Sequence, residues 1–394
     1  MNTDKIYELK IEKIVPKGLG MGFAEKMTFF VPLAAQGDVL KVKVNQLKGK
    51  VAFAEIVEIS EPSPDRVIPQ CEYFGRCGGC DFQQLNYQAQ LAAKIGMIQD
   101  CLSRIGKIKY ENEINIVESP KEYGYRARAA WHLDTRTRKF GYFRRGSHDI
   151  IDVKHCPILT DELQKTLTDL RGEVEWGNLW ENKVEIEAAT ADGQESVFSV
   201  EIIEPTNEIV FSVNEEKYIY SAHCFFQGNS LLIEKLIETA IGGAAGENAL
   251  DLYCGVGLFT LPLARKFAKV DGVEGNPKAV EYAQKNIENA RIENAEVIAE
   301  SVGDWLEDNL SDLKNIDFIL LDPPRTGAET AIIQSILKIH PTEISYVSCE
   351  PSVLARDLRI LIDGGYKIES ITAVDLFPQT HHIETIVRLR RENQ

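Results

Sequence analysis

Short apolar runs separated by turns make up the first sixty residues of the chain. The runs cover residues 7–15, 27–31, 39–44 and 51–59. Gly18, Gly20 and Gly22 indicate a turn after the first run. Four or five short strands in a segment of this length predict a small OB-like barrel, whose outer face commonly binds oligonucleotides. A β-rich appendage without a ligand is the alternative. Residues 61–65 form a turn-rich linker, so we expect a first domain at residues 1–62.

Residues 82–108 repeat apolar side chains at the spacing of a helix. The repeating positions are Leu85, Ala89, Ala92, Ile95, Ile98, Leu102 and Ile105. This pattern predicts a helix that docks on another domain, with Cys101 in its packed face. Alternating runs over residues 183–221, where no motif indicates a role, complete a β-rich middle domain that we expect at residues 63–221.

From about residue 222 onward the pattern changes to alternating strands and helices. A buried strand runs from Ala249 into a glycine turn that ends at Gly257, and a helical segment follows over residues 258–267. Later strands are predicted at residues 270–274, 297–300, 318–322, 344–349 and 383–389, with a helix at 352–362. The alternation predicts a mostly parallel, doubly wound α/β sheet of the Rossmann-like kind over residues 222–394. Ligands of such sheets lie outside the carboxyl ends of the strands.

The charge of the chain is unevenly distributed. A formal net charge of −16 over 394 residues argues at first against a nucleic-acid partner, because phosphate is bound mainly by Lys and Arg. However, residues 161–216 hold 15 acidic and 3 basic residues, so this segment alone supplies −12. We expect that acidic face to point away from RNA. Net charge therefore hides any basic patch elsewhere.

A basic stretch lies at residues 121–145. Its basic residues are Lys121, Arg126, Arg128, Arg136, Arg138, Lys139, Arg144 and Arg145, and its aromatic residues are Tyr123, Tyr125, Trp131, Phe140, Tyr142 and Phe143. Cations that neutralise phosphates, combined with aromatic faces that stack on unpaired bases, predict contact with single-stranded or looped RNA. The alternative is a charged β meander whose aromatic rings form a core.

The composition indicates a cytoplasmic protein of two or three domains. Hydrophobic content of 44% and charged content of 26% are typical of a globular chain. Charged residues within the first twenty leave no apolar signal-peptide core, and no apolar run reaches the length of a membrane span. In the cytoplasm the eight cysteines are not expected to form disulfides. They indicate metal binding or catalysis instead.

Three cysteines lie close together in the pattern C-x5-C-G-G-C. They are Cys71, Cys77 and Cys80, and Cys156 offers a fourth thiol after a long insertion. Three clustered thiols with a distant fourth favour an iron–sulfur cluster, whereas structural zinc usually takes paired C-x2-C arms. A zinc site and unrelated buried thiols are the alternatives. The spacing also differs from the C-x3-C-x2-C of radical enzymes, which favours a structural or RNA-positioning cluster.

The first predicted strands of the second half carry the features of a nucleoside site. Asp251 precedes a turn that contains Gly255 and Gly257, and Glu274 closes the next strand. Glycine admits a ligand close to the backbone, and a carboxylate accepts hydrogen bonds from ribose hydroxyls. Thr260 stands where the dinucleotide fingerprint has its third glycine, so the turn favours S-adenosylmethionine over a dinucleotide.

Reactive groups follow the later strands at the same predicted rim. Asp322-Pro-Pro-Arg325 closes one strand, and Cys349 closes another. By itself this loop resembles the D-P-P-Y loop of methyltransferases that act on exocyclic amines, which need no nucleophile. A thiol suits uracil C5 instead, because addition of a thiolate to C6 makes C5 nucleophilic enough to accept a methyl group. A base must then remove the C5 proton, and Glu384 is available beside His381 and His382, to which we assign no role.

These motifs together resemble the RNA uracil-C5 methyltransferase family, in particular its iron–sulfur branch that acts on 23S ribosomal RNA. The motifs are a TRAM-like N-terminal region, C-x5-C-G-G-C with Cys156, Phe225-Phe226-Gln227, D-L-Y-C-G-V-G, D-P-P-R, S-C-E-P and H-H-I-E-T. The resemblance implies a class I methyltransferase domain after a TRAM barrel and a cluster-bearing middle domain. It also implies S-adenosylmethionine and a [4Fe-4S] cluster as cofactors.

The resemblance assigns roles to individual residues. Cys349 would be the nucleophile and Glu384 the base, while Asp322 and Arg325 would position the uracil and Phe225 would stack on it. The expected cofactor residues are Gln227, Asp251, Tyr253, Gly255, Gly257, Glu274 and Asp322, and the expected cluster ligands are Cys71, Cys77, Cys80 and Cys156. The expected partner is ribosomal RNA, or alternatively transfer RNA, bound by a monomer. An exocyclic-amine methyltransferase and a non-catalytic RNA-binding protein remain as alternatives.

Overall fold

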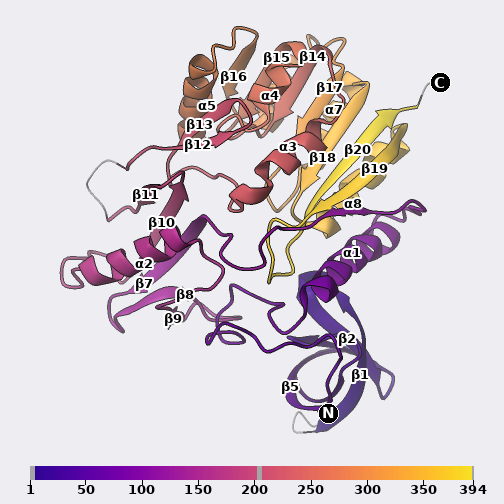
Figure 1. Ribbon diagram of the computed structural model, residues 1–394. Coiled ribbons are helices and arrows are strands. Elements are labelled where there is room, and N and C mark those ends of the chain that lie inside the picture. Colours follow the sequence, from indigo (N-terminus) through magenta and orange to yellow (C-terminus); the bar gives the residue numbers. More distant parts are fainter. Residues whose placement is uncertain (1–4, 202–205, 393–394) are drawn as a thin grey trace.

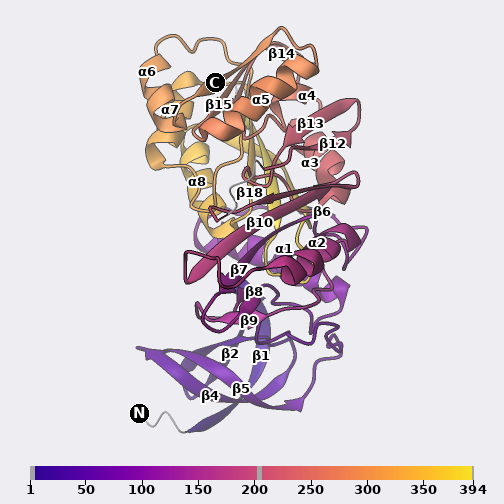
Figure 2. The same cartoon turned by 90° about the vertical axis from the view of Figure 1, so that its left-hand side faces the viewer.

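The computed structural model describes residues 5–201 and 206–392. A small barrel lies at one end of the molecule, a large sheet covered by helices lies at the other, and a smaller sheet lies beside them (Figure 1). A view turned by 90° shows the barrel and the large sheet again at opposite ends (Figure 2).

The N-terminal part is a closed β-barrel with the strand order β1-β2-β3-β5-β4. Its strands are β1 (Ile6–Val15), β2 (Leu19–Ala24), β3 (Met27–Pro32), β4 (Val39–Lys48) and β5 (Val51–Glu61). The predicted barrel is confirmed. The glycine stretch, which was predicted as a turn, forms most of strand β2. Glycine is needed at position 22, because a Cβ there would lie 2.5 Å from the carbonyl oxygen of Lys10. These glycines let neighbouring barrel strands approach closely.

Helix α1 (Tyr87–Arg104) connects the barrel to the large sheet. It is shorter than the sequence pattern predicted, because Asn86 caps it by accepting a hydrogen bond from the backbone N–H of Ala89 at 2.9 Å. Met97 packs in the barrel core, whereas Ile98, Cys101 and Leu102 pack in a core of the large sheet. The helix therefore holds the two parts of the molecule together.

The cap on α1 gives a testable stability effect. We expect Asn86→Ala to lower the free energy of unfolding by about 1 kcal/mol, because the backbone N–H groups of the first turn lose their acceptor. Chemical denaturation measures this loss. Asn45→Ala is the control, since Asn45 lies exposed on a strand and its amide reaches only Glu55 at 3.4 Å. An equal change in both variants would contradict the capping role.

The middle part is a five-stranded sheet with the order β11-β10-β7-β8-β9, and helix α2 (Asp161–Glu173) contacts it. Its strands are β7 (Arg128–Asp134), β8 (Lys139–Phe143), β9 (Ile150–Asp152), β10 (Lys183–Ala191) and β11 (Gln194–Phe198). Tyr125, Trp131 and Phe140 are buried in its core. The expectation that these rings stack on RNA bases was wrong, because an alternating strand pattern also places aromatic residues on an inner face.

The large sheet has eight strands in the order β16-β15-β14-β17-β18-β20-β19-β6. They are β6 (Asn115–Val117), β14 (Gly246–Leu252), β15 (Phe267–Glu274), β16 (Ala295–Ala299), β17 (Phe318–Leu321), β18 (Glu343–Ser348), β19 (Tyr366–Val374) and β20 (Glu384–Arg391). The predicted α/β fold is confirmed. All pairings within the group β14 to β18 are parallel. Strand β20 lies between β18 and β19 and is antiparallel to both. Phe267 begins β15 and does not end a helix.

Helices cover both faces of this sheet. One core takes side chains from α3 (Ile233–Ile241), α4 (Thr260–Ala264) and α5 (Pro277–Asn289). The other takes them from α1, α6 (Val302–Asn309), α7 (Thr330–Ile339) and α8 (Pro351–Asp363). The hairpin of β12 (Ile209–Val213) and β13 (Glu216–Tyr220) also contributes to the first core, although it precedes the domain boundary expected at residue 222.

Among the described residues, no helix combines the length and apolarity needed to cross a membrane. All eight cysteines are free thiols.

Candidate active site

Three reactive side chains meet at one rim of the large sheet. Asp322 follows the carboxyl end of β17, and Cys349 follows the carboxyl end of β18. Glu384 begins β20, and β20 pairs with β18 so that Ser348 lies opposite Thr385. Because β20 is antiparallel, its first residue lies at the rim where its neighbours end. The strand order thus gathers a thiol and two carboxyl groups.

The half-buried thiol of Cys349 has an unusually high pKa. Burial is the main cause that raises its pKa to about 12, and the nearby Glu384 and Asp322 raise it further, whereas Arg325 acts in the opposite direction. The thiol is therefore protonated at neutral pH before a substrate binds, and Arg325 is a cation that favours the thiolate form.

Alkylation of Cys349 should report this high pKa. We expect its rate of reaction with iodoacetamide to rise throughout pH 7 to 10, because the thiolate fraction keeps increasing, whereas an ordinary thiol levels off near its pKa of about 8.5. Arg325→Gln should slow the reaction, since it removes the group that lowers this pKa. Mass spectrometry of the peptide that contains Cys349 separates it from the other cysteines. A rate that is already constant at pH 7 would contradict the prediction.

The two carboxyl groups at the rim are also perturbed. Burial and the neighbouring Asp322 raise the pKa of Glu384 well above its usual range, and Arg325 opposes this shift. Desolvation, followed by the proximity of Asp251, raises the pKa of Asp322 to about 7. Glu384 is 3% exposed, and its Oε1 atom has no hydrogen-bond partner in the part of the chain that the structure describes. A buried acceptor without a partner is costly, and such groups occur at functional sites.

The expected nucleoside site is built around the turn after β14. Gly255 and Gly257 have φ values of 55° and 90°, which glycine adopts without strain. Glu274 at the end of β15 accepts hydrogen bonds from the backbone N–H groups of Gly255 at 3.0 Å and Asn276 at 2.7 Å. Its oxygens each retain a lone pair for a further donor. Tyr253 also has a positive φ of 65°, a strained conformation that is typical of functional turns.

Asp251 lies below this turn and is fully buried. It accepts a hydrogen bond from the hydroxyl of Thr260 at 2.6 Å, and burial raises its pKa to about 7. Thr260, which replaces the third glycine of the dinucleotide fingerprint, thus has a structural role that the sequence did not indicate.

The segment at residues 225–227 exposes its first side chain and buries the next two. Phe225 is 65% exposed, while Phe226 and Gln227 are buried. Phe226 stacks on Tyr220 with ring centroids 4.2 Å apart. The guanidinium of Arg128 lies 5.7 Å from the ring of Phe225. Phe225 is therefore free to contact a ligand, and Phe226 anchors the segment in the core.

The four expected cluster cysteines line one small cavity of about 30 Å³. Tyr142 and Arg126 line it as well. Burial is the main cause that raises the pKa of each of the four thiols. Among the described residues, no three Cys, His, Asp or Glu side chains are arranged to hold a single metal ion. The sequence spacing thus correctly predicted that these thiols come together, but the cluster itself is not shown.

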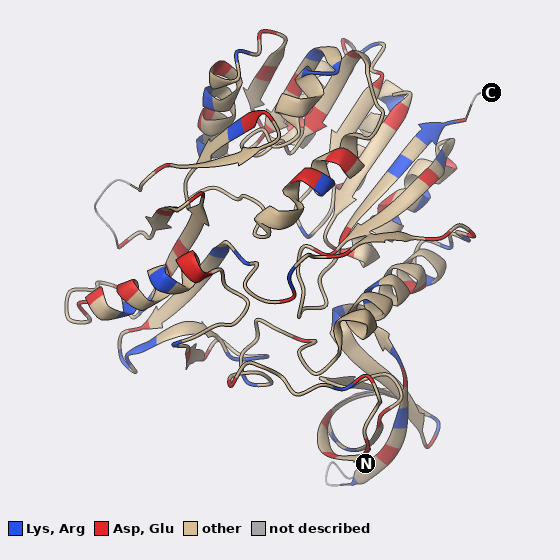
Figure 3. Ribbon diagram, in the orientation of Figure 1, with Lys and Arg blue, Asp and Glu red and all other residues tan. Residues whose placement is uncertain are grey.

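The basic stretch divides into internal and exposed residues. Arg128 pairs with Glu187, and Arg145 pairs with Asp81 at 2.7 Å. Arg126 donates a hydrogen bond to the carbonyl of Arg128. The exposed members are Lys121, Arg136, Arg138, Lys139 and Arg144. Basic residues at the β7–β8 turn and acidic residues on α2 both occur in the middle part of the molecule (Figure 3).

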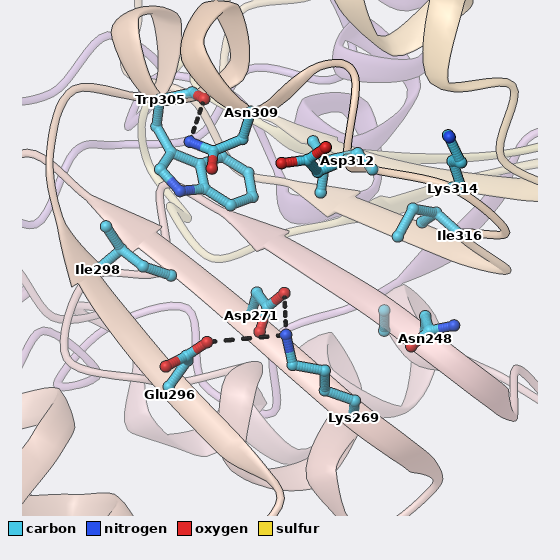
Figure 4. Close-up of a pocket in the computed structure, with 12 residues that line it drawn as sticks. Asn248, Lys269, Asp271, Glu296, Ile298, Trp305, Asn309, Asp312, Lys314 and Ile316 are labelled. Atoms are coloured by element: carbon cyan, nitrogen blue, oxygen red, sulfur yellow. Dashed lines mark hydrogen bonds and ion pairs between the residues drawn. The ribbon is translucent and has the colours of Figure 1, made fainter.

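A larger cavity of about 400 Å³ lies away from this rim, over the beginning of β14 and β15 (Figure 4). Trp305 forms one wall, and Lys269 bridges Asp271 at 2.9 Å and Glu296 at 3.7 Å. None of the predicted site residues lines it. It is therefore separate from the rim that carries the thiol.

The loop before Glu384 holds contacts that sequence reasoning missed. Nδ1 of His381 lies 2.6 Å from the carboxylate of Asp81. The rings of His381 and His382 are 4.1 Å apart, and burial, His381 and Arg325 lower the pKa of His382 to about 3. No sequence signal could have paired Asp81 with a residue 300 positions away.

A solved enzyme structure matches almost the whole chain. The crystal structure of the Pyrococcus abyssi tRNA (uracil-54, C5)-methyltransferase in complex with S-adenosyl-L-homocysteine matches with a TM-score of 0.75 and 26% identity, and the match covers 97% of this chain and 100% of that one. The fold and the rim therefore place the protein among the S-adenosylmethionine-dependent methyltransferases.

Sequence relatives define the family. A model of the tRNA (Uracil-5-)-methyltransferase family matches residues 158–392. An RNA methyltransferase of Synechocystis is 32% identical, with 98% of this chain and 96% of the relative covered. The 23S rRNA (uracil(1939)-C(5))-methyltransferase of Shewanella amazonensis is 31% identical, with 95% and 94% covered. The chain belongs to this family and is an RNA uracil-C5 methyltransferase, as the motifs predicted.

Proposed function

We propose that the protein methylates C5 of a uracil in 23S ribosomal RNA through a covalent bond between Cys349 and C6 of the base. The observation that carries this proposal is the convergence of Cys349, Glu384 and Asp322 at one rim, which results from the antiparallel insertion of β20. A nucleophile, a base and a group that can hold the uracil are the side chains that this chemistry needs.

The proposed steps begin at Cys349. Its thiol loses a proton to solvent, and the thiolate sulfur bonds to C6, which moves the C5–C6 double-bond electrons toward C5 and the O4 carbonyl. Arg325 is placed to favour the thiolate form, because it lowers the pKa of Cys349. C5 then bonds to the methyl group while the bond from that methyl group to the sulfur of the donor breaks, and the sulfur keeps the electron pair. The carboxylate of Glu384 takes the C5 proton, the C5–C6 double bond forms again, and the thiolate leaves.

S-adenosylmethionine supplies an electrophilic methyl group in this reaction. The turn after β14 fits such a ligand, because Gly255 leaves open space beside the backbone and the Glu274 carboxylate has unused lone pairs. We propose that Gln227, Tyr253 and Asp322 line the same site, and that Asp251 supports the turn from below. Phe225, which is exposed beside Arg128, is the proposed platform for the target base.

The choice of ribosomal RNA over transfer RNA rests on the relatives. The relative that acts on 23S rRNA is 31% identical, and the one that acts on uracil 54 of tRNA is 26% identical. Methyl transfer from labelled S-adenosylmethionine should therefore be faster to 23S rRNA than to tRNA, when both come from cells that lack this protein. Mapping of 5-methyluridine in those cells should show one missing site in 23S rRNA. A missing site in tRNA would favour the alternative substrate.

We also propose that the four cysteines hold a [4Fe-4S] cluster. Four thiols that line one cavity form a donor set suited to such a cluster, and Gly79 between two of them lets the backbone pass close by. Protein purified without oxygen should be brown and contain about four iron atoms per chain. Stoichiometric zinc without iron would overturn this part of the proposal.

Each of the three parts of the chain has a proposed role. The barrel at residues 1–62 and the exposed basic residues of the middle domain at 63–221 would hold the RNA, and residues 222–394 would perform the reaction. All the side chains invoked belong to one chain, so the proposed active form is a monomer. We place the reaction in the cytoplasm, because none of the eight cysteines forms a disulfide.

A further inference from the structure

The loop that leads into Glu384 is held from outside the catalytic domain. This loop, residues 375–383, connects β19 to β20 and is mostly buried. Its contacts come from the cysteine-bearing segment, from α1 and from Tyr125, whose hydroxyl donates to the carbonyl of Pro378 at 2.8 Å. The catalytic sheet alone therefore does not define its shape.

Gln379 is the point where this loop is most tightly fixed. It has a φ of 68°, which is unfavourable for a residue with a side chain. Gln90 of α1 accepts from its backbone N–H at 2.9 Å and donates to its side-chain oxygen at 3.1 Å. Its carbonyl accepts from the N–H groups of both Asp81 and Phe82 at 3.0 Å. A strained residue persists only when its surroundings hold it in this way.

Asp81 connects this loop to the cysteines. It directly follows Cys80, which lines the small cavity. Its carboxylate accepts from Arg145 at 2.7 Å and contacts Nδ1 of His381 at 2.6 Å, and Arg145 also donates to the carbonyl of Cys80. The barrel closes the same junction, because a Cβ on Gly18 would lie 3.0 Å from both His381 and Phe82.

His381 lies close to the reacting groups along the chain. It is three residues before Glu384, and its ring lies 4.1 Å from that of His382, whose pKa is influenced by Arg325. Arg325 in turn influences both Cys349 and Glu384. The contact of Asp81 with His381 therefore reaches the rim through the three residues of backbone that join His381 to Glu384.

We propose that Asp81 and His381 are positioning residues, through which the cysteine-bearing segment holds Glu384 where it can remove the C5 proton. The inference rests on the proposed role of Glu384 as the base. Neither residue needs to touch the RNA or the methyl donor for this function. A shift of the base by about 1 Å is enough to slow a reaction about a hundredfold.

The test separates proton removal from the steps before it. We expect Asp81→Ala to lower kcat by about tenfold to a hundredfold with the KM for S-adenosylmethionine unchanged. The methylated covalent RNA adduct should accumulate on denaturing gels, because Cys349 still attacks while proton removal is slow. His381→Ala should also accumulate the adduct, and the double variant should be no slower than Asp81→Ala alone, since the contact between Asp81 and His381 is already lost in that single variant. Asp81→Asn keeps an acceptor for His381 and should retain intermediate activity.

Glu72→Ala is the matched control, because Glu72 follows Cys71 as Asp81 follows Cys80 but is exposed. It should behave like the wild type. A wild-type kcat in Asp81→Ala would overturn the inference. So would a loss of activity without adduct, accompanied by a lower iron content or a lower melting temperature. Glu384→Gln in the same assay distinguishes this outcome from failure of the proposed function, since absence of adduct there would mean that Glu384 is not the base.

Discussion

Replacement of Cys349 by alanine should abolish methyl transfer. We expect the rate to fall by at least about a thousandfold, because without the thiol C5 of the uracil remains too poor a nucleophile to accept the methyl group. The binding of S-adenosylmethionine should be unchanged, since the turn after β14 does not involve Cys349. Incorporation of labelled methyl groups into RNA measures the loss, and calorimetry measures the binding.

Adduct formation provides an independent readout of the same variant. RNA that contains 5-fluorouridine should form a stable covalent complex with the wild-type protein, because fluorine at C5 cannot leave as a proton. This complex should be absent in Cys349→Ala. Cys101→Ala is the control, because Cys101 is another buried thiol but belongs to the packed face of α1. An adduct that survives Cys349→Ala would show that a different residue is the nucleophile.

The sequence predicted the architecture of the catalytic half because its signals are local. The alternation of buried runs and helices identifies the strands, and the rule for open α/β sheets then places Asp322 and Cys349 at a common rim. Glu384 is different, since it begins its strand and does not end it. It reaches the rim only because β20 is antiparallel, and the sequence offered Glu384 as a base without indicating the direction of its strand.

Contacts between distant segments account for most of what the sequence did not predict. The alternating pattern of residues 121–145 fits both RNA-facing and core-facing aromatic residues, and the structure places Trp131 and Phe140 inside. Arg128 and Arg145 were read as phosphate ligands, but acidic partners from other segments bind both. The contact of Asp81 with His381 joins two distant segments, and no pattern in the sequence of either segment indicates the other.

Glu384→Gln should stall the reaction after methyl transfer instead of before it. Burial is the main cause of the raised pKa of Cys349, and Glu384 only adds to it, so replacement of Glu384 by a neutral amide should leave the attack on C6 intact. Proton removal from C5 should slow by about a hundredfold to ten-thousandfold, which is the usual contribution of a general base. Because elimination of Cys349 must wait for this step, unmodified RNA should become trapped as a methylated adduct.

The accumulation of that adduct is what identifies Glu384 as the base and not merely as a group that binds the uracil. A residue needed only for binding would raise KM and leave little adduct, whereas a base leaves the adduct as the dominant species. Glu350→Gln is the matched control, since Glu350 is adjacent to Cys349 but caps α8 by accepting from the backbone N–H of Ser352 at 3.3 Å. That variant should turn over normally. If Glu384→Gln instead lost both turnover and adduct, Glu384 would be required before the methyl group is transferred, and Asp322 would be the remaining carboxylate at the rim able to act as the base.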